Sequence, residues 1–323
     1  MAEAVVVRAT GGPEVLETAR VDLPAPGPDQ LLVDVAAAGV NYIDTYHRQG
    51  VYAKDLPFTP GSEGAGIVRA LGPGVTGVAV GDHVAWADVA GSYAQQVVVP
   101  ANRAFPVPGG VDDETAAAAM LQGLTAHYLV TSTYAVKPGD TVLVHAAAGG
   151  VGLLLVQAAK SRGGKVIGTV STAAKEALAR EAGADEVIRY TETDFAEEVG
   201  RLTGGAGVGA VYDGVGKDTF DRSLACLAVR GTLALFGASS GPVPPVDPQR
   251  LNSGGSVFLT RPTLGHHIAT AEEFRWRCEE LFSAITGGRL IVRIGGRYPL
   301  ADARKAHEDL EGRRTTGKLL LIP

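Results

Sequence analysis

The chain has 323 residues, of which 46% are hydrophobic and 20% are charged. This amount of apolar surface excludes a disordered chain, and the net charge of −6 argues against a nucleic-acid-binding protein, which needs a basic face. No run of about 18 apolar residues predicts a membrane span. The 43 glycines exceed the usual share of about 7%, and because they show no three-residue period they do not indicate collagen.

The chain has two cysteines, Cys226 and Cys278. Two thiols are too few for a four-thiolate structural zinc site or for a disulfide framework. We therefore expect a reduced, cytoplasmic protein. The first residues lack a basic segment followed by an apolar run, so we expect no signal peptide.

Residues 1–122 are typical of a β-rich, barrel-like domain. Short apolar runs alternate there with Gly, Pro and Asp turn signals. The runs that we interpret as strands are Ala4–Arg8, Leu31–Ala37, Gly66–Leu71, His83–Ala87 and Ala94–Val99.

A change in residue composition near residue 112 predicts helices. The acidic residues Asp112 to Glu114 precede the small residues Thr115–Met120, and acidic side chains stabilise a helix N-terminus. We expect a second helix over Gly123–Tyr134.

From Thr141 onward, strand patterns alternate with helix patterns, which predicts a doubly wound parallel sheet with right-handed crossovers. Six strands match the dinucleotide-binding architecture. The expected strands are Thr141–His145, Lys165–Val170, Glu186–Tyr190, Gly209–Asp213, Thr232–Phe236 and Ser256–Thr260. The expected helices are Val151–Arg162, Ala173–Ala182, Phe195–Leu202 and Lys217–Ala228.

The last part of the chain is expected to return to the first domain. The organisation is then residues 1–122 in a β-rich domain, 123–264 in a cofactor domain and 265–323 back in the β-rich domain. The elements expected in this last part are a helix over Ala271–Thr286, a strand over Leu290–Arg293, a helix over Ala301–Glu311 and a strand over Lys318–Ile322.

Three glycine clusters compete as phosphate-binding loops. Gly72 to Gly77 has the spelling G-x-G-x-x-G, but it contains Pro73 and no helical pattern follows it, so we interpret it as a turn. Gly204 to Gly209 follows a helix and precedes a strand, which is the wrong side of the sheet for a phosphate loop.

The third cluster, Ala146 to Gly152, follows an expected strand and opens an expected helix. Its small residues let the backbone approach a pyrophosphate, and the helix dipole favours the anion there. Gly149, Gly150 and Val151 are therefore candidate cofactor contacts. The alternative is a tight strand-to-helix turn without a ligand.

An Asp or Glu at the end of the second strand of the sheet would bind the ribose 2′-hydroxyl of NADH. Here that strand ends in Ser171 and Thr172, with Lys175 nearby, and no carboxylate stands among them. Ser171 and Lys175 are suited to a 2′-phosphate, and Tyr190 is expected to pack beside it. The pattern favours NADPH. Taken alone, however, Lys175 is explained equally well as an exposed lysine in the first turn of a helix.

Several motifs together resemble the medium-chain dehydrogenase/reductase superfamily, and within it the zinc-independent, zeta-crystallin-like quinone oxidoreductases. The resemblance extends over essentially the whole chain. It implies an α/β protein with a GroES-like β-rich catalytic domain and a Rossmann domain. The motifs are Gly39–Asp44, Pro60–Gly66, Val80–Val84, Ala146–Gly152, Tyr212–Gly216, Leu259–Pro262 and Gly317–Pro323.

Zinc-containing alcohol dehydrogenases of this superfamily have a cysteine and a histidine where this chain has Asn41 and Ser62. Asn and Ser are poor zinc ligands, so we expect no metal. Glu63 remains, but one carboxylate does not make a zinc site.

The resemblance also implies where NADPH lies. The nicotinamide is expected in a cleft between the two domains, with Asn41, Asp44, Tyr46, Arg48 and Tyr52 lining or supporting it. The other cofactor contacts that it implies are Thr125, Gly237, Ser239, Ser240, Phe258, Thr260 and Arg313.

Reduction of a quinone needs hydrogen-bond donors for the developing oxyanions. Asn41, Tyr46 and Tyr52 are candidate catalytic donors, and ordinary packing is the alternative for the tyrosines. We expect an NADPH-dependent quinone oxidoreductase. The alternatives are reduction of an enone or enoyl thioester, and a non-catalytic NADPH-binding protein. The resemblance suggests a homodimer joined through an edge strand near Ser256–Thr260.

Overall fold

The computed structural model describes residues 1–23 and 25–323, which form two compact units. The first unit comprises Met1–Leu124, Ile268–Gly288 and Val292–Pro323. The second unit comprises Thr125–His267 and Arg289–Ile291. In the part of the chain that the structure describes, none of the helices combines the length and apolarity needed to cross a membrane.

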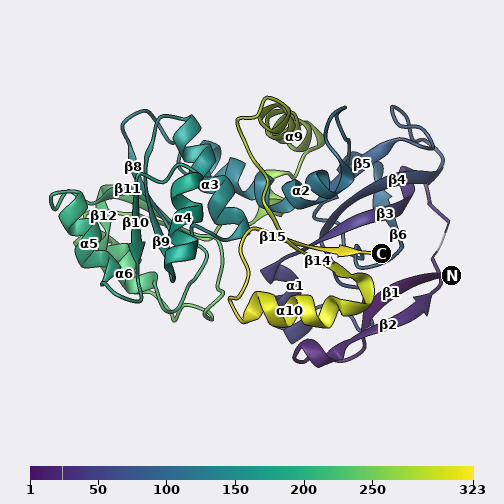
Figure 1. Ribbon diagram of the computed structural model, residues 1–323, viewed down its shortest axis with the longest axis horizontal. Helices are drawn as coiled ribbons and strands as arrows, with labels where there is room; N and C mark the ends of the chain where they lie inside the picture. Colours follow the sequence, from purple (N-terminus) through teal and green to yellow (C-terminus); the bar gives the residue numbers. More distant parts are fainter. Residues whose placement is uncertain (24) are drawn as a thin grey trace. The chain divides into compact units, whose positions relative to one another are not determined.

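The first unit is built on a seven-stranded sheet (Figure 1). The order is β14-β15-β3-β4-β5-β7, and β6 pairs with β3 as an additional strand. A separate antiparallel ladder joins β1 to β2. The strands are β1 (Ala2–Val7), β2 (Leu16–Val21), β3 (Gln30–Val40), β4 (Glu63–Leu71), β5 (His83–Ala87), β6 (Gln96–Pro100), β7 (Ala104–Pro106), β14 (Ile294–Pro299) and β15 (Lys318–Ile322).

Strand β3 is central because its side chains alternate between the core and the other face. Leu31, Val33 and Val35 point into a core that also contains the fully buried Trp86. A Cβ on Gly66 of β4 would lie 2.0 Å from the backbone oxygen of Asp34, so a glycine is required where β4 approaches β3. This tight pairing holds the ends of β3 and β4 in place.

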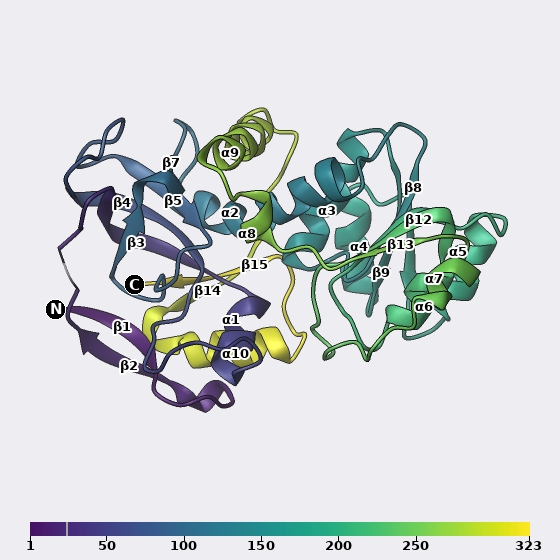
Figure 2. The same ribbon diagram turned by 180° about the vertical axis from the view of Figure 1, so that it is seen from behind.

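Helices α1 (Tyr42–Gln49) and α10 (Ala303–Glu311) lie side by side in both views (Figures 1 and 2). The Tyr42 hydroxyl donates to the backbone oxygen of Leu310 at 3.0 Å. The Arg48 guanidinium donates to both carboxylate oxygens of Glu311, at 3.0 and 2.9 Å. Helix α2 (Asp113–Tyr128) begins in the first unit, which also contains α9 (Ala271–Thr286).

The second unit contains the predicted parallel sheet. Its strands β8 (Thr141–Val144), β9 (Lys165–Val170), β10 (Glu186–Arg189), β11 (Val208–Asp213), β12 (Leu227–Leu235) and β13 (Phe258–Thr260) run in the order β10-β9-β8-β11-β12-β13. Counted along the chain this order is 3-2-1-4-5-6, the dinucleotide-binding arrangement. The helices of this unit are α3 (Gly150–Ser161), α4 (Ala173–Glu181), α5 (Phe195–Leu202), α6 (Phe220–Ala225), α7 (Gln249–Ser253) and α8 (Leu264–His267).

Three expected helices differ in extent from the structure. The two helices expected over Thr115–Met120 and Gly123–Tyr134 are one helix, α2, followed by a π-helical turn over Leu129–Thr133. Gly123 lies inside this helix, where the absence of a side chain makes room for Leu281: an added Cβ would lie 2.7 Å from the Leu281 side chain. The helix expected over Lys217–Ala228 is the shorter α6, since β12 already begins at Leu227.

The strand expected over Leu290–Arg293 is absent, and the strand in this region is β14. The apolar run misled the prediction because Ile291 is 69% exposed. Strand β14 begins with Ile294 and two glycines, which do not look like a strand pattern. A Cβ on Gly295 would lie 1.6 Å from the backbone oxygen of Thr316, so glycine allows the close approach here. Helix α1 and strand β2 were not anticipated at all.

Candidate active site

The second unit gathers the predicted cofactor residues at the carboxyl ends of its strands. Because all six strands are parallel, every segment that follows a strand emerges at the same edge of the sheet. The order of the strands reverses between β8 and β11, and ligands bind at such a switch point. The predicted residues that follow or end these strands are Gly149, Gly150, Val151, Ser171, Lys175, Tyr190, Gly237, Ser239, Ser240 and Thr260.

The glycine loop after β8 has the geometry of an anion site. Gly149 is the N-cap of α3, and the helix begins at Gly150, so the first backbone N–H groups of α3 point out of the helix end. Ala146 has φ of +51°, a left-handed conformation that is uncommon outside glycine. A Cβ on Gly152 would lie 2.2 Å from the backbone oxygen of Ala146, so this turn requires a glycine at position 152.

A series of buried, hydrogen-bonded polar side chains holds the residue that precedes this loop. His145 directly precedes Ala146, and its Nδ1 and Nε2 atoms lie 2.9 Å from the hydroxyls of Thr169 and Ser223. The Ser223 hydroxyl donates to Asp213 Oδ2 at 2.8 Å. Burial lowers the pKa of His145, which keeps the imidazole neutral as a link between the two hydroxyls. Sequence reasoning missed this series because its members come from four separate segments.

The end of β9 carries hydroxyls and a lysine where NADH-binding proteins have a carboxylate. Thr172 caps α4 by accepting the backbone N–H of Lys175 at 3.3 Å, so Lys175 lies in the first turn of that helix. Tyr190 follows β10, the neighbouring strand, and its side chain is 42% exposed. Lys175 and Tyr190 thus lie after adjacent strands, at one edge of the sheet.

The remaining predicted cofactor residues are dispersed. Thr125 is buried on α2, and Phe258 is 60% exposed at the start of β13. Arg313 belongs to the first unit, where it has φ of +55° in the turn between α10 and β15. Their contact with a cofactor stays a prediction.

The first unit brings Asn41 into a buried polar cluster. Asn41 is the residue between β3 and α1, and it is 4% exposed. Its Nδ2 donates to Glu63 Oε1 at 2.6 Å, and its Oδ1 accepts from Lys318 Nζ at 2.7 Å and from Gln122 Nε2 at 3.2 Å. Lys318 also donates to Glu63 Oε1, and the backbone N–H of Leu121 donates to Glu63 Oε2 at 2.5 Å.

Asp44 anchors the start of α1 beside this cluster. Its carboxylate accepts the backbone N–H of Asn41 at 2.9 Å, the hydroxyl of Ser62 at 3.0 Å and the hydroxyl of Tyr93 at 3.1 Å. Burial raises the pKa of the fully buried Asp44 to about 6. The carboxylate is therefore ionised at neutral pH and holds three donors from three segments.

A directed chain of hydrogen bonds ends on Asp44. Arg48 lies 3.0 Å from His307 Nδ1, and because a guanidinium can only donate, Nδ1 must accept. His307 Nε2 then carries the proton and donates to the Tyr93 hydroxyl at 3.0 Å, which leaves the phenol proton for Asp44. Burial lowers the pKa of His307 to about 3, so its neutral form is the one that takes part.

The two candidate tyrosines lie together on and after α1. The rings of Tyr46 and Tyr52 meet edge to face, with centroids 5.6 Å apart. The backbone oxygen of Tyr46 accepts the backbone N–H of Tyr52 at 3.3 Å. Tyr52 is 42% exposed. The two rings thus lie against each other, with Tyr52 exposed and Tyr46 half-buried, and their catalytic role stays a prediction.

The chain matches known proteins over its full length. Residues 150–282 match a family model described as zinc-binding dehydrogenase, and residues 27–109 match the alcohol dehydrogenase GroES-like domain. A quinone oxidoreductase from Pseudomonas aeruginosa is 46% identical and is aligned over 100% of both chains. A mycobacterial protein solved as a complex with NADPH is 57% identical, with a TM-score of 0.97 over 99% of this chain and 100% of that one. A 2-haloacrylate reductase from a Burkholderia species is 41% identical over 100% of this chain and 99% of its own.

This chain belongs to the quinone oxidoreductase family of the medium-chain dehydrogenase/reductase superfamily.

The zinc-binding name of the superfamily model raises the question of a metal in this quinone oxidoreductase. Asn41 and Ser62 stand where zinc-containing members are expected to have ligands, and a buried ammonium, that of Lys318, donates to Asn41. An amide and a hydroxyl bind zinc poorly, and an adjacent positive charge repels it. Within residues 1–23 and 25–323 no group of three or more His, Cys, Asp or Glu is placed to hold a metal ion. The residues therefore do not fit zinc.

Sequence reasoning found Asn41, Asp44 and Glu63 but missed the partners that hold them. Lys318 was placed in the last strand without a role, and Gln122 was not considered as a partner of Asn41. A signal for α1 was present, since Asn41 followed three residues later by Asp44 resembles a capping box.

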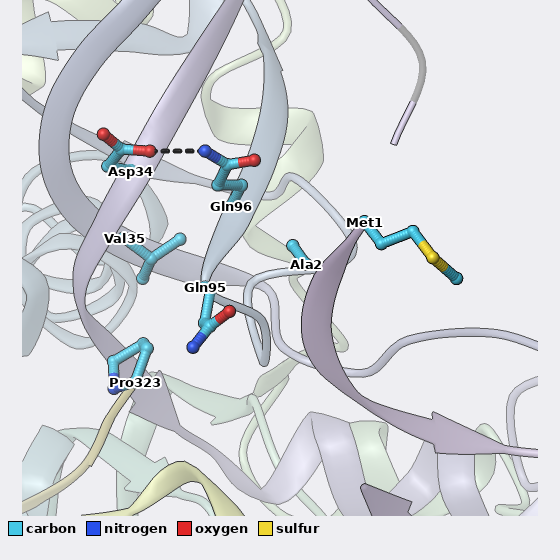
Figure 3. A pocket seen from close by; sticks show the side chains of 7 residues that line it. All are labelled: Met1, Ala2, Asp34, Val35, Gln95, Gln96 and Pro323. Atoms are coloured by element: carbon cyan, nitrogen blue, oxygen red, sulfur yellow. Dashed lines mark hydrogen bonds between the residues drawn. The ribbon is translucent and has the colours of Figure 1, made fainter. Parts of the chain in front are cut away.

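A hollow near the two chain ends does not belong to this site (Figure 3). It is lined by seven residues, among them Met1 and Pro323. Its one carboxylate side chain, that of Asp34, already accepts from Gln96 Nε2 at 2.7 Å.

Substitution of Gly152 by alanine should weaken cofactor binding. The added Cβ would displace the backbone oxygen of Ala146, and overpacking of this kind costs about 1–3 kcal/mol. We expect the dissociation constant for NADPH, measured by fluorescence titration, to rise about tenfold. Gly200→Ala in α5 is the matched control, because its Cβ would meet nothing within 4 Å. An unchanged NADPH affinity for Gly152→Ala would contradict the assignment of this loop.

Asp44 should make a pH-dependent contribution to stability. Its pKa is raised from 3.8 to about 6, so its favourable contribution is complete below the unfolded pKa and is lost as the pH rises through about 6. The loss amounts to about 3 kcal/mol, since one pKa unit corresponds to about 1.4 kcal/mol. We expect wild-type protein to lose stability relative to Asp44→Asn between about pH 4 and about pH 7.5, in urea unfolding experiments. A difference in unfolding free energy that stays constant with pH would show that Asp44 does not titrate in this range.

Proposed function

We propose that this chain transfers a hydride from NADPH to a quinone. The observation that carries the proposal is the glycine loop at the start of α3, where Gly152 permits a close backbone approach, in a chain that is similar over its full length to a quinone oxidoreductase. The similar mycobacterial protein was solved with NADPH. The overall reaction is NADPH + H⁺ + quinone → NADP⁺ + hydroquinone.

NADPH supplies the hydride when it is bound. The protein contributes binding and orientation: the N-terminus of α3 holds the pyrophosphate, and Ser171 and Lys175 hold the 2′-phosphate. Gly237, Ser239, Ser240, Phe258, Thr260, Thr125 and Arg313 are proposed as further cofactor contacts. Asn41, Tyr46 and Tyr52 are proposed to face the reacting groups, where the two phenols donate hydrogen bonds to the quinone oxygens.

A second candidate is reduction of an activated carbon–carbon double bond. The observation that favours it is the 41% identity to a 2-haloacrylate reductase over the full length of both chains. The same cofactor loop would serve both reactions, because each begins with hydride transfer from a nicotinamide.

A substrate panel tests the two candidates. We expect oxidation of NADPH, followed by its absorbance, to be fastest with 1,4-benzoquinone or naphthoquinone and slower with enones and 2-haloacrylates. Turnover of an enone or a 2-haloacrylate well above that of any quinone would replace the first proposal by the second. Binding of NADPH without turnover of either class would favour a non-catalytic protein.

Lys175 should decide the preference between the two nicotinamide cofactors. Lys175→Ala removes a charge-assisted hydrogen bond worth about 1.5–3 kcal/mol, so we expect the dissociation constant for NADPH to rise about tenfold or more. The affinity for NADH, which has no 2′-phosphate, should change little. Lys165→Ala is the control because Lys165 lies at the other end of the same strand, β9. Equal losses for both cofactors would contradict the 2′-phosphate assignment.

We also propose that two copies pair through β13, the end strand of the parallel sheet. Phe258 and Val229 are 60% and 78% exposed on this strand and on its neighbour β12, and an open edge with exposed apolar side chains favours pairing with another chain. We expect a dimer in light scattering and a shift toward the monomer for Val229→Glu. A monomeric wild-type protein would overturn the pairing. The cytoplasmic location stays a prediction.

A further inference from the structure

The side chain of Lys318 is 1% exposed, which makes it one of the largest fully buried side chains of the described residues. A buried ammonium loses its hydration and is retained only where carboxylates and hydrogen-bond acceptors compensate. Here the compensation comes from the carboxylate of Glu63 and the amide oxygen of Asn41. An apolar residue would satisfy the packing of this core without that requirement, so the charge itself calls for an explanation.

The ammonium dictates how the Asn41 side chain is turned. An ammonium has three donors and no acceptor, so the oxygen of the carboxamide must face Lys318. Gln122 Nε2 donates to the same oxygen at 3.2 Å. The amide nitrogen then faces Glu63 Oε1 at 2.6 Å. Turning the amide by 180° would set two donors against its nitrogen and an acceptor against its oxygen, so only one orientation is stable.

Paired strands hold this cluster. Lys318 is the first residue of β15, whose next residue pairs with Val40 at the end of β3. Glu63 is the first residue of β4, which pairs with β3 from the other side. A Cβ on Gly39 of β3 would lie 2.3 Å from Glu63 Oε1, so the absence of a side chain there makes room for the carboxylate. The placement of the three side chains is therefore set by the sheet.

One atom of the cluster lacks a partner. Gln122 Oε1 is buried and has no hydrogen bond from any described residue, although the Nε2 atom of the same amide is bonded to Asn41. A buried acceptor without a donor is destabilising, so this oxygen needs a donor that residues 1–23 and 25–323 do not supply, such as a water molecule or a ligand hydroxyl. The cluster is thus incomplete on the side of Gln122.

We propose that Lys318 is a positioning residue of the reductase: its ammonium locks the Asn41 carboxamide in one orientation. This proposal rests on the proposed function, since it takes Asn41 to face the reacting groups. Lys318 acts through Asn41 and does not itself contact substrate or cofactor.

The test removes both charges of the Lys318–Glu63 pair together, so that neither is left buried without its partner. Lys318→Met alone leaves the Glu63 carboxylate buried without its counter-ion, and misfolding of this variant would follow from that charge alone. The informative variant is Lys318→Met combined with Glu63→Gln, which is neutral and similar in shape. Its control is Arg277→Met combined with Glu273→Gln, which removes a pair with one buried partner from α9 of the same unit.

We expect the Lys318/Glu63 double variant to melt near the wild-type temperature and to bind NADPH within about threefold of wild type. Its kcat with a quinone should fall about tenfold or more, because Asn41 is no longer held in one orientation. The Arg277/Glu273 control should keep the wild-type kcat. In a background with Asn41→Leu, the Lys318/Glu63 double change should lower kcat little further, because both changes remove the same effect.

Three results would overturn the proposal: a wild-type kcat in the double variant, a double variant that is as unstable as Lys318→Met, or a loss of kcat that adds fully to that of Asn41→Leu. A wild-type kcat would mean that Lys318 only neutralises Glu63. An unstable double variant would mean that Lys318 is needed for folding. Full additivity with Asn41→Leu would mean that Lys318 does not act through Asn41. The wild-type assay, run in parallel, distinguishes these results from a failure of the proposed function, in which wild-type protein itself would not oxidise NADPH with quinones.

Discussion

Burial of charge is the constraint on which the first unit depends. Glu63 and Asp44 are both 0% exposed, and each carboxylate is stable there only because three or more groups of the chain donate to it or neutralise it. The donors come from β15, α1, α2 and the segments around Ser62 and Tyr93. A loss of the pairing of β15 or of β4 with β3 would separate Lys318 from Glu63 and leave a charge unpaired in the core, so the polar cluster and this part of the sheet require each other.

The constraint on the second unit is different. Backbone N–H groups at the start of α3 are left without partners within the helix, and the loop that carries them must still be stable. Ala146 adopts a left-handed conformation and Gly152 packs directly against its carbonyl group. The residue before this turn, His145, is fixed by hydroxyls on β9 and α6. Strain in the turn is thus held by buried hydrogen bonds below it, as is common where a backbone conformation serves a ligand.

Much of the second unit could be predicted because its signals are local. Helix α5 and strand β9 begin and end at the expected residues, α4 ends one residue earlier than expected, and α3 is shifted by one residue at both ends. Alternation of strands and helices also predicted the parallel sheet, which the strand order confirms. The first unit was less predictable. Strand β14 contains Gly295 and Gly296, and its pairing with β15 depends on a residue some twenty positions away, which no local pattern reveals.

The sequence by itself determined that a glycine loop follows the first strand of the sheet and that no carboxylate ends the second strand. These are statements about residue type and spacing, and local chemistry is enough to interpret them. Only the tertiary structure decided that Lys318 meets Asn41 and Glu63, across separations of 277 and 255 residues. The physical reason is that strand pairing and the cost of an unpaired buried charge act between segments that are distant in the chain.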